Sequence, residues 1–263
     1  MISIKQDTII LITMASETQI TDIDIKALSA LTITGFALYG AYKFVELWSP
    51  VVSIKRWLQN DPNNGIIYMF DDKINNTSVF DTENTNYYKN LIIRVPKNIQ
   101  IKLILSTSGG YTNNCSILLN CLREHSAGYV AYIYDHAMSS GTMIALGAKQ
   151  IVMSRYSYLT KIDPTWNNIN TLHAKKIINQ NLNATNQALS ELHVCNQVHY
   201  SIECEVAKII KSQFSSQMYD KIISKLIYSE LIHTYSFYFD DCKNLDLPIR
   251  YPEAHELRFF NSY

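Results

Sequence analysis

Two apolar runs that end in small residues set the architecture: IKLILSTSGG at 101–110 and YVAYIYDHAMSSGTMIALGAKQIVM at 129–153. Each run begins as an apolar, β-branched stretch of strand length and reaches Gly or Ser after the predicted strand. Apolar residues at helical spacing lie between the two runs, and a third strand is predicted at Gln150–Met153. Successive strand–turn–helix units place their turns side by side at one edge of a parallel sheet, where open α/β sheets bind ligands.

The two predicted turns carry complementary chemistry. Gly109 and Gly110 permit backbone conformations that a Cβ would penalise, and they allow another molecule to approach the main chain. Ser139 and Ser140 stand at the predicted start of a buried helix, beside N–H groups without an intrahelical partner and at the positive end of the helix dipole. Acyl transfer needs a nucleophile beside such donors, which makes Ser139 a candidate nucleophile. The competing interpretation is that Ser139 is a simple helix N-cap.

Three motifs follow one another along the chain: STSGG (106–110), AMSSGTMIALGAKQIVM (137–153) and IDP (162–164). In this combination they resemble the serine dehydrogenase proteinase family, whose pattern is close to H-T-P-G-G, A-M-S-G-G-T-x-I-A-L-A-A-D-E-I-V-M and G-P-V-D-P-Q. The family is related to the Clp protease and to signal peptide peptidase A. Near the end, IHTYSFYFDDCKNLDLPI (232–249) is similar to a family segment of the type T-H-D-Y-P-I-x-x-x-E-A-K-E-L-G-L-P-V, and we expect it to pack on the edge of the cleft.

The resemblance implies an α/β domain of the Clp and crotonase type with a helical C-terminal region. It also implies a serine peptidase in which Ser139 is the nucleophile and the amides of Gly109 or Gly110 and of Ser140 form the oxyanion hole. No metal or organic cofactor is implied. The implied partners are a peptide or protein substrate and further copies of the chain, since relatives work as oligomers that enclose their sites.

The catalytic base is less evident. Clp proteases have a histidine about two dozen residues after the nucleophile, where this chain reads Ile-Asp-Pro at 162–164. A Ser-Lys dyad, as in the membrane-bound relatives, would use Lys176 or Lys175, and a lysine can serve as base only where burial favours its neutral form. A second alignment puts Gln187 in the lysine position, which predicts an inactive protein. His136, shortly before the nucleophile, ranks behind the lysines.

Two other functions stay open, the first of them because of departures from the family pattern. Ser106 and Ser108 replace the family's His and Pro, and Ser140 replaces a glycine, which would be strained if that position needed a positive φ. A catalytically inactive relative that keeps the fold for binding or assembly is one alternative. A crotonase-type acyl-CoA enzyme, which uses similar paired amides, is the other, although the chain lacks an evident acidic pair.

Composition restricts the class of protein. The 263 residues are 47% apolar and 17% charged with a formal net charge of +0, which indicates a globular protein and disfavours nucleic acid as a partner. The five cysteines are odd in number and lack C-x-x-C spacing, which disfavours a zinc site.

An uncharged segment, ALSALTITGFALYGAY at 27–42, lies between Lys26 and Lys43. It is shorter than the roughly 20 residues that usually span a bilayer, but with Trp48 as an interfacial anchor we predict one transmembrane helix over 27–48. The flanking charges predict that the large domain is cytoplasmic, in a single-pass membrane protein. The alternative is a buried helix of a soluble domain.

The predicted organisation is an N-terminal segment (1–26), the membrane helix (27–48) and a protease domain (49–263). Within that domain we expect a strand at 66–70, a helix that stops at Pro96, and C-terminal helices divided near Cys204. Arg258, Phe259 and Phe260 are expected to form an exposed tail.

Overall fold

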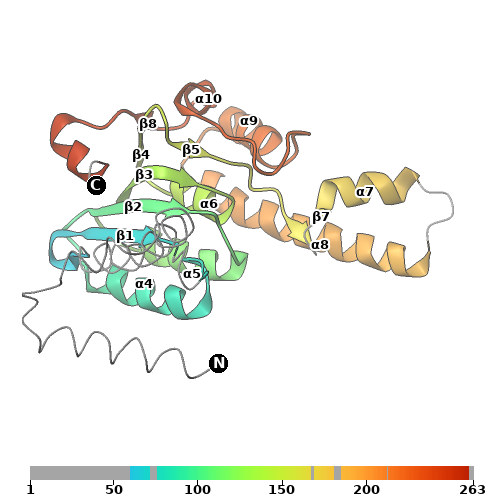
Figure 1. Ribbon diagram of the computed structural model, residues 1–263, viewed down its shortest axis with the longest axis horizontal. Coiled ribbons are helices and arrows are strands. Elements are labelled where there is room, and N and C mark those ends of the chain that lie inside the picture. The colour runs from blue at the N-terminus through green and yellow to red at the C-terminus, as the bar shows by residue number, and fades with distance from the viewer. Residues whose placement is uncertain (1–59, 72–75, 167–168, 181–184, 212, 261–263) are drawn as a thin grey trace, which may run out of the picture. The chain divides into compact units, whose positions relative to one another are not determined.

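The computed structural model describes residues 60–71, 76–166, 169–180, 185–211 and 213–260 (Figure 1). The predicted segments 1–26 and 27–48 lie outside them. In the part of the chain that is described, no helix combines the length and the apolar character needed to cross a membrane. The chain divides into the units Met1–Pro50 and Val51–Tyr263, and the elements below belong to the second.

A parallel sheet with strand order β1-β2-β3-β4-β8 lies at the centre of this unit (Figure 1). Its strands are β1 (Ile66–Phe70), β2 (Ile101–Thr107), β3 (Tyr129–Ala137), β4 (Gln150–Met153) and β8 (Ile249–Arg250). A short strand, β5 (Tyr158–Leu159), pairs with the end of β3 beyond β4. The predicted α/β architecture with a parallel sheet is therefore confirmed.

Helices cover one face of the sheet. They are α4 (Thr82–Arg94), α5 (Thr112–Arg123) and α6 (Ser140–Leu146), preceded by a turn of 3₁₀-helix, η1 (Pro62–Asn64). Alternate strand residues such as Leu103 and Leu105 join the helices in the main core, in which every residue of α6 is buried. Because both faces of the sheet are covered by other parts of the chain, the strands read as nearly continuous apolar runs.

The other face of the sheet is covered by the end of the chain. Phe259, in the 3₁₀-helix η2 (Ala254–Phe259), is only 3% exposed, and its ring centroid lies 5.0 Å from that of Tyr132. The expected exposed tail is therefore wrong for Phe259. Ile104 and Val152 are apolar on this face as well, and the chain's own end removes them from water.

The C-terminal region is helical, as expected. It contains α7 (Thr171–Gln180), α8 (Asn186–Lys211), α9 (Ser216–Leu226) and α10 (Phe239–Asn244), with a short hairpin of β6 (Thr165–Trp166) and β7 (Ile169–Asn170) before α7. The predicted division near Cys204 is wrong, because α8 continues through it. Ile202, Val206 and Ile209 keep one apolar face of α8 buried across that position.

Candidate active site

The turn between β3 and α6 holds Ser139 in an unusual backbone conformation. Its φ of 49° and ψ of −111° lie in a region that costs a non-glycine residue about 1–3 kcal/mol. The turn is fixed by the Ser139 N–H, which donates to Thr160 Oγ1 at 3.0 Å, and by the Met143 N–H, which donates to the Ser139 carbonyl at 3.2 Å. The Ser139 side chain makes no capping hydrogen bond, so the simple N-cap interpretation is wrong.

The glycine turn after β2 lies directly against this serine. Gly109 has a φ of +97°, and a Cβ added there would come within 2.9 Å of both Ser139 Cβ and the Met138 carbonyl oxygen. The Ser140 hydroxyl donates to the Gly110 carbonyl at 2.8 Å, which ties the two turns together. The structure therefore brings together all four residues of the predicted nucleophile and oxyanion hole.

Two amides at this junction are available to an oxyanion. The Gly109 N–H donates to Thr107 Oγ1 at 3.1 Å, so it is already occupied. Among the described residues, neither the Gly110 N–H nor the Ser140 N–H has an acceptor. Ser140 is an ordinary first residue of α6 and does not need a positive φ, whereas Ser139 has one.

Asp71, at the end of β1, holds the glycine turn in place. Its Oδ1 accepts from the Thr107 hydroxyl at 2.7 Å, and its Oδ2 accepts from the Ser108 N–H at 2.6 Å. Ser106, the other departure from the family pattern, donates to Asp135. Sequence reasoning missed Asp71, since nothing in its local pattern connects it with a turn more than thirty residues away.

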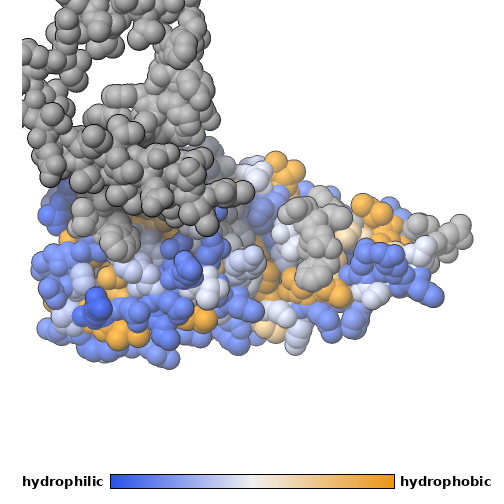
Figure 2. Space-filling view, turned by 60° about the horizontal axis from the view of Figure 1, so that its bottom comes forward, coloured by the Kyte–Doolittle hydropathy of each residue, from blue (hydrophilic) through white to orange (hydrophobic). Residues whose placement is uncertain are grey.

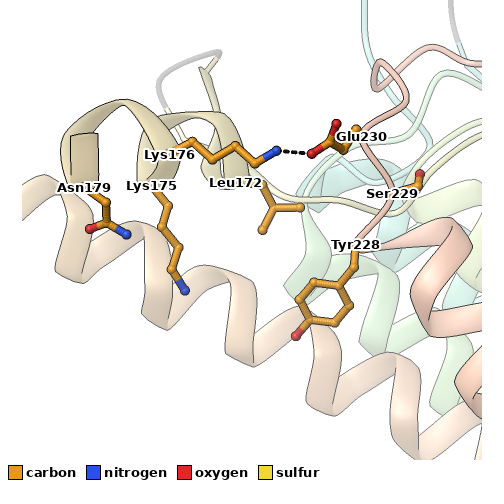
Figure 3. A pocket seen from close by; sticks show the side chains of 7 residues that line it. All are labelled: Leu172, Lys175, Lys176, Asn179, Tyr228, Ser229 and Glu230. Carbon is orange, nitrogen blue, oxygen red and sulfur yellow. Dashed lines mark hydrogen bonds and ion pairs between the residues drawn. The ribbon is translucent and has the colours of Figure 1, made fainter. Parts of the chain in front are cut away.

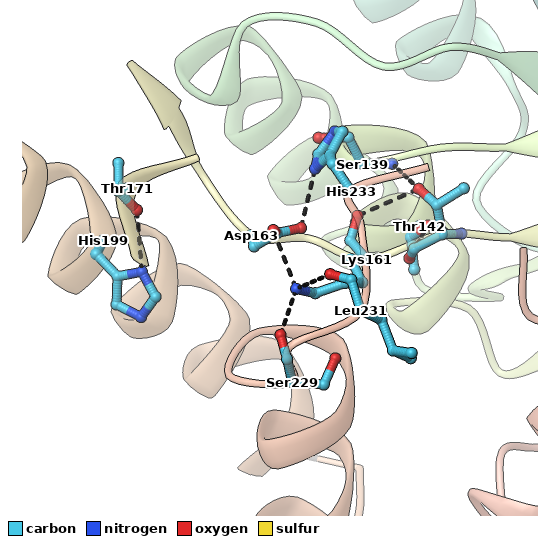
Figure 4. A network of polar contacts seen from close by, with 10 residues as sticks. Ser139, Thr142, Lys161, Asp163, Thr171, His199, Ser229, Leu231 and His233 are labelled. Atoms are coloured by element: carbon cyan, nitrogen blue, oxygen red, sulfur yellow. Dashed lines mark hydrogen bonds and ion pairs between the residues drawn. The ribbon is translucent and has the colours of Figure 1, made fainter. Parts of the chain in front are cut away.

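A carboxylate and an imidazole from distant parts of the chain form an acid–base pair. Asp163 Oδ1 is 2.9 Å from His233 Nδ1, and the Asp163 side chain is 0% exposed, whereas that of His233 is 29% exposed (Figure 4). Burial acts to raise the pKa of Asp163, but the hydrogen bonds and charges of His233 and Lys161 outweigh it, and the pKa lies below its ordinary value. An ionised Asp163 fixes Nδ1 of the ring as the donor and leaves Nε2 to accept.

The segment from Leu159 to Asp163 connects this pair with the nucleophile turn. Thr160 accepts from the Ser139 amide, and Leu159 forms two backbone hydrogen bonds with Phe237, of 3.0 and 2.8 Å, that hold the chain bearing His233 alongside. Figure 4 draws Ser139 and His233 at the same end of this network. No hydrogen bond joins the Ser139 hydroxyl to the His233 ring in the described residues, and such contacts often tighten only when substrate binds.

The lysines expected as bases lie elsewhere. Lys175 and Lys176, on α7, line a cavity of about 330 Å³ together with Leu172, Asn179 and residues 228–230 (Figure 3). Lys176 forms an ion pair with Glu230, and its side chain is 55% exposed. Neither Ser139 nor either glycine lines this cavity. The structure does not supply the burial that a lysine base requires.

The remaining base candidates have other partners. Gln187 is exposed on α8 and donates to Glu191 at 3.2 Å. His136 stacks on Tyr158, with ring centroids 5.6 Å apart, and lies 3.1 Å from Asp135. The signal for His233 was present in the sequence, in the segment similar to T-H-D-Y-P-I, but it lies far beyond the histidine position of Clp proteases.

Known proteins resemble the chain in sequence and in structure. Two curated relatives come from Methanocaldococcus jannaschii. "Uncharacterized protein MJ0137" is 24% identical over 156 residues, and "Uncharacterized protein MJ1495" is 24% identical over 158 residues. The matches cover 59% of this chain but 54% and 53% of those proteins, so the chain spans about half the length of the curated relatives it matches.

Two solved structures are similar at low identity. ClpP1 from Listeria monocytogenes has a TM-score of 0.48 at 9% identity, covering 74% of this chain and 95% of that one. A peptidase from Plasmodium falciparum has a TM-score of 0.48 at 10% identity, covering 73% of this chain and 97% of that one.

A family model provides the assignment. The model described as ClpP-like SDH-type serine proteinase matches residues 77–257, well over half of the 263-residue chain. The matched range contains both turns, Ser139, and the Asp163–His233 pair. The chain belongs to the family of ClpP-like SDH-type serine proteinases.

Proposed function

We propose that the protein is a serine peptidase in which Ser139 is the nucleophile, His233 the general base and Asp163 the residue that orients the base. The observation that carries this proposal is the 2.9 Å contact between His233 and the fully buried Asp163, on a segment bonded to the Ser139 turn. Family membership supports the reaction class. Peptide or protein chains are the proposed substrates.

The proposed reaction follows from these positions. The Ser139 hydroxyl oxygen attacks the scissile carbonyl carbon while its proton passes to His233 Nε2, and the charge of Asp163 stabilises the imidazolium that forms. The carbonyl oxygen, now negative, accepts from the Gly110 and Ser140 amides. His233 returns the proton to the leaving amine as the C–N bond breaks. A water molecule activated by His233 then hydrolyses the acyl-enzyme and restores the hydroxyl.

The proposed triad occurs in the chain order Ser, Asp, His. Asp163 stands near the place where Clp proteases have their histidine, and the histidine of this chain comes about seventy residues later. A buried carboxylate and an imidazole in contact can orient a base in either order, because the chemistry depends on geometry and not on sequence position. A Ser-Lys dyad remains the competing hypothesis for the same reaction class.

Covalent labelling with a fluorophosphonate probe tests this proposal on the full-length chain. We expect Ser139→Ala to abolish labelling and His233→Gln to slow it by about 10²–10⁴-fold, the usual contribution of a general base. The matched controls Lys175→Met and Lys176→Met should label at the wild-type rate, with thermal unfolding confirming that every variant is folded. If Lys176→Met lost its labelling while His233→Gln kept the wild-type rate, the Ser-Lys dyad would be favoured. An unlabelled wild-type protein would favour the inactive relative.

We further propose that residues 27–48 anchor the protein in a membrane, with the large domain on the cytoplasmic side, and that the protein self-associates. The first proposal is supported by the uncharged run between Lys26 and Lys43, and the second by family resemblance.

A further inference from the structure

Lys161 is a buried cation that the mechanism above does not use. The residue is 1% exposed, and its Nζ contacts three oxygens: the Ser229 carbonyl at 2.7 Å, the Leu231 carbonyl at 3.0 Å and Asp163 Oδ2 at 3.1 Å (Figure 4). An ammonium group has three protons to donate, so each has an acceptor here. Burying a lysine is unfavourable unless its charge is paired and its donors are satisfied, and both conditions are met.

The three acceptors connect the two halves of the acid–base pair. Two of them belong to the backbone at 229–231, directly before His233, and the third is the carboxylate that orients the His233 ring. Asp163 presents one oxygen to Lys161 and the other to His233. One cation therefore holds both the carboxylate and the chain segment that bears the imidazole.

We propose that Lys161 is a positioning residue for the peptidase reaction: it fixes the His233 segment against Asp163 and shares the charge of that carboxylate. This inference rests on the proposed function of the Ser139 site. The contact with Asp163 connects Lys161 to the carboxylate that orients the base, and the two carbonyl contacts connect it to the segment that bears the base.

The charge sharing has a definite direction. Lys161 and His233 both contact Asp163, and His199 on α8 interacts electrostatically with Asp163 and Lys161. Without the ammonium, the whole carboxylate charge would favour protonated His233, which cannot accept a proton from Ser139. Labelling by a fluorophosphonate would then require a higher pH.

Three variants separate the charge of Lys161 from its hydrogen bonds. Lys161→Met loses both, Lys161→Gln keeps an N–H donor without the charge, and Lys161→Arg keeps the charge and donors. In Lys161→Met we expect labelling to slow about 10–100-fold, the effect of misplacing a catalytic group by about 1 Å. In Lys161→Gln we expect the acid limb of the labelling profile to move up by about 1 pH unit. Lys161→Arg should recover most of the rate and the wild-type profile.

Hydrogen–deuterium exchange of the same full-length variants provides a readout that does not depend on activity. We expect faster exchange at 229–237 in Lys161→Met, with exchange in α5 unchanged as the control for folding. Wild-type exchange at 229–237 together with a wild-type labelling rate would overturn the proposal. If the wild-type protein is not labelled at all, the proposed function fails, while exchange still decides whether Lys161 holds the His233 segment. If Lys161→Met does not fold, the labelling rate and the exchange at 229–237 are compared between Lys161→Gln and Lys161→Arg instead.

Discussion

Ser139 shows how much of the site depends on a single backbone conformation. Its φ of 49° presents the hydroxyl at the start of α6 without letting it cap the helix, so the side chain stays available for chemistry. The sequence predicted the residue but not the strain, because the pattern Ser-Ser-Gly-Thr is equally compatible with an ordinary N-cap. The proposed base was not predicted either: His233 lies in a family-like segment, but it is far from Ser139 in sequence and meets Asp163 only through the tertiary fold.

The strain at Ser139 predicts a difference between two inactive variants. Ser139→Gly relieves the positive φ, whereas Ser139→Ala keeps it, so we expect the glycine variant to have a free energy of unfolding about 1 kcal/mol higher than the alanine variant. Urea denaturation of both proteins measures this difference. Equal stability, or a more stable alanine variant, would contradict the strained conformation.

Gly109 should be sensitive to substitution because it lies directly against the nucleophile turn. In Gly109→Ala the new methyl group would meet Ser139 Cβ and the Met138 carbonyl at 2.9 Å, so we expect labelling to fall at least about 10-fold as the turn shifts. Gly128→Ala is the matched control. It has a φ of +70°, but its new Cβ would meet only the flexible Lys149 side chain, so we expect unchanged labelling and a similar loss of about 1–2 kcal/mol in stability. Wild-type labelling in Gly109→Ala would show that the two turns are not in contact.

Among the elements, the four strands β1 to β4 and the first helices followed from local pattern. β4 and β1 have the predicted bounds, and α6 is buried throughout, because apolar periodicity and small residues determine these elements locally. The two wrong predictions, the exposed tail and the division near Cys204, concern segments whose structure depends on contacts with residues far away in sequence. Phe259 of η2 is buried because η2 packs on an apolar face of the sheet. α8 continues past Cys204 because its apolar face stays in contact with the core beyond that residue.

The packing of η2 depends on an ion pair that titrates in acid. Arg250 donates to both oxygens of Glu256, at 2.5 and 2.7 Å, and Tyr132 donates to Oε1 at 2.7 Å. The Arg250 hydrogen bonds lower the pKa of Glu256 to about 2 despite burial, which raises it. A carboxyl whose folded-state pKa is depressed stabilises the fold above its ordinary value of 4.5 and loses that contribution as the pH falls toward 2.

We therefore expect Glu256→Gln to lower the free energy of unfolding by about 1.5–3 kcal/mol at pH 7, the value of a hydrogen bond to a charged group. The difference from wild type should shrink between pH 4.5 and pH 2, as measured by chemical denaturation across this range. Glu191→Gln, which removes an exposed carboxylate, is the control and should change little. A pH-independent difference would contradict the role of the ion pair.

For the whole molecule, the described residues form a domain with a polar surface interrupted by separate apolar patches on the face drawn in Figure 2. Large exposed apolar residues occur on α7 and α8, among them Ile177 at 65% and Tyr200 at 67%. Such residues suit contacts between copies of the chain, although single exposed apolar side chains are ordinary.

Membrane attachment can be measured directly. We expect the full-length protein to remain with the membrane pellet after alkaline carbonate extraction, because a helix over 27–48 would hold it in the bilayer. A variant lacking residues 1–48 should move to the supernatant. Release of the full-length protein would contradict the predicted anchor and favour a buried helix of a soluble domain.

The most direct test of the triad is a crystal structure of the protein after reaction with a fluorophosphonate. We expect a bond between phosphorus and Ser139 Oγ, with the phosphonyl oxygen about 3 Å from the Gly110 and Ser140 amides. We also expect His233 Nε2 about 3 Å from Ser139 Oγ, with Asp163 still bound to Nδ1. A His233 ring turned away from the adduct, or a lysine in its place, would contradict the proposed triad.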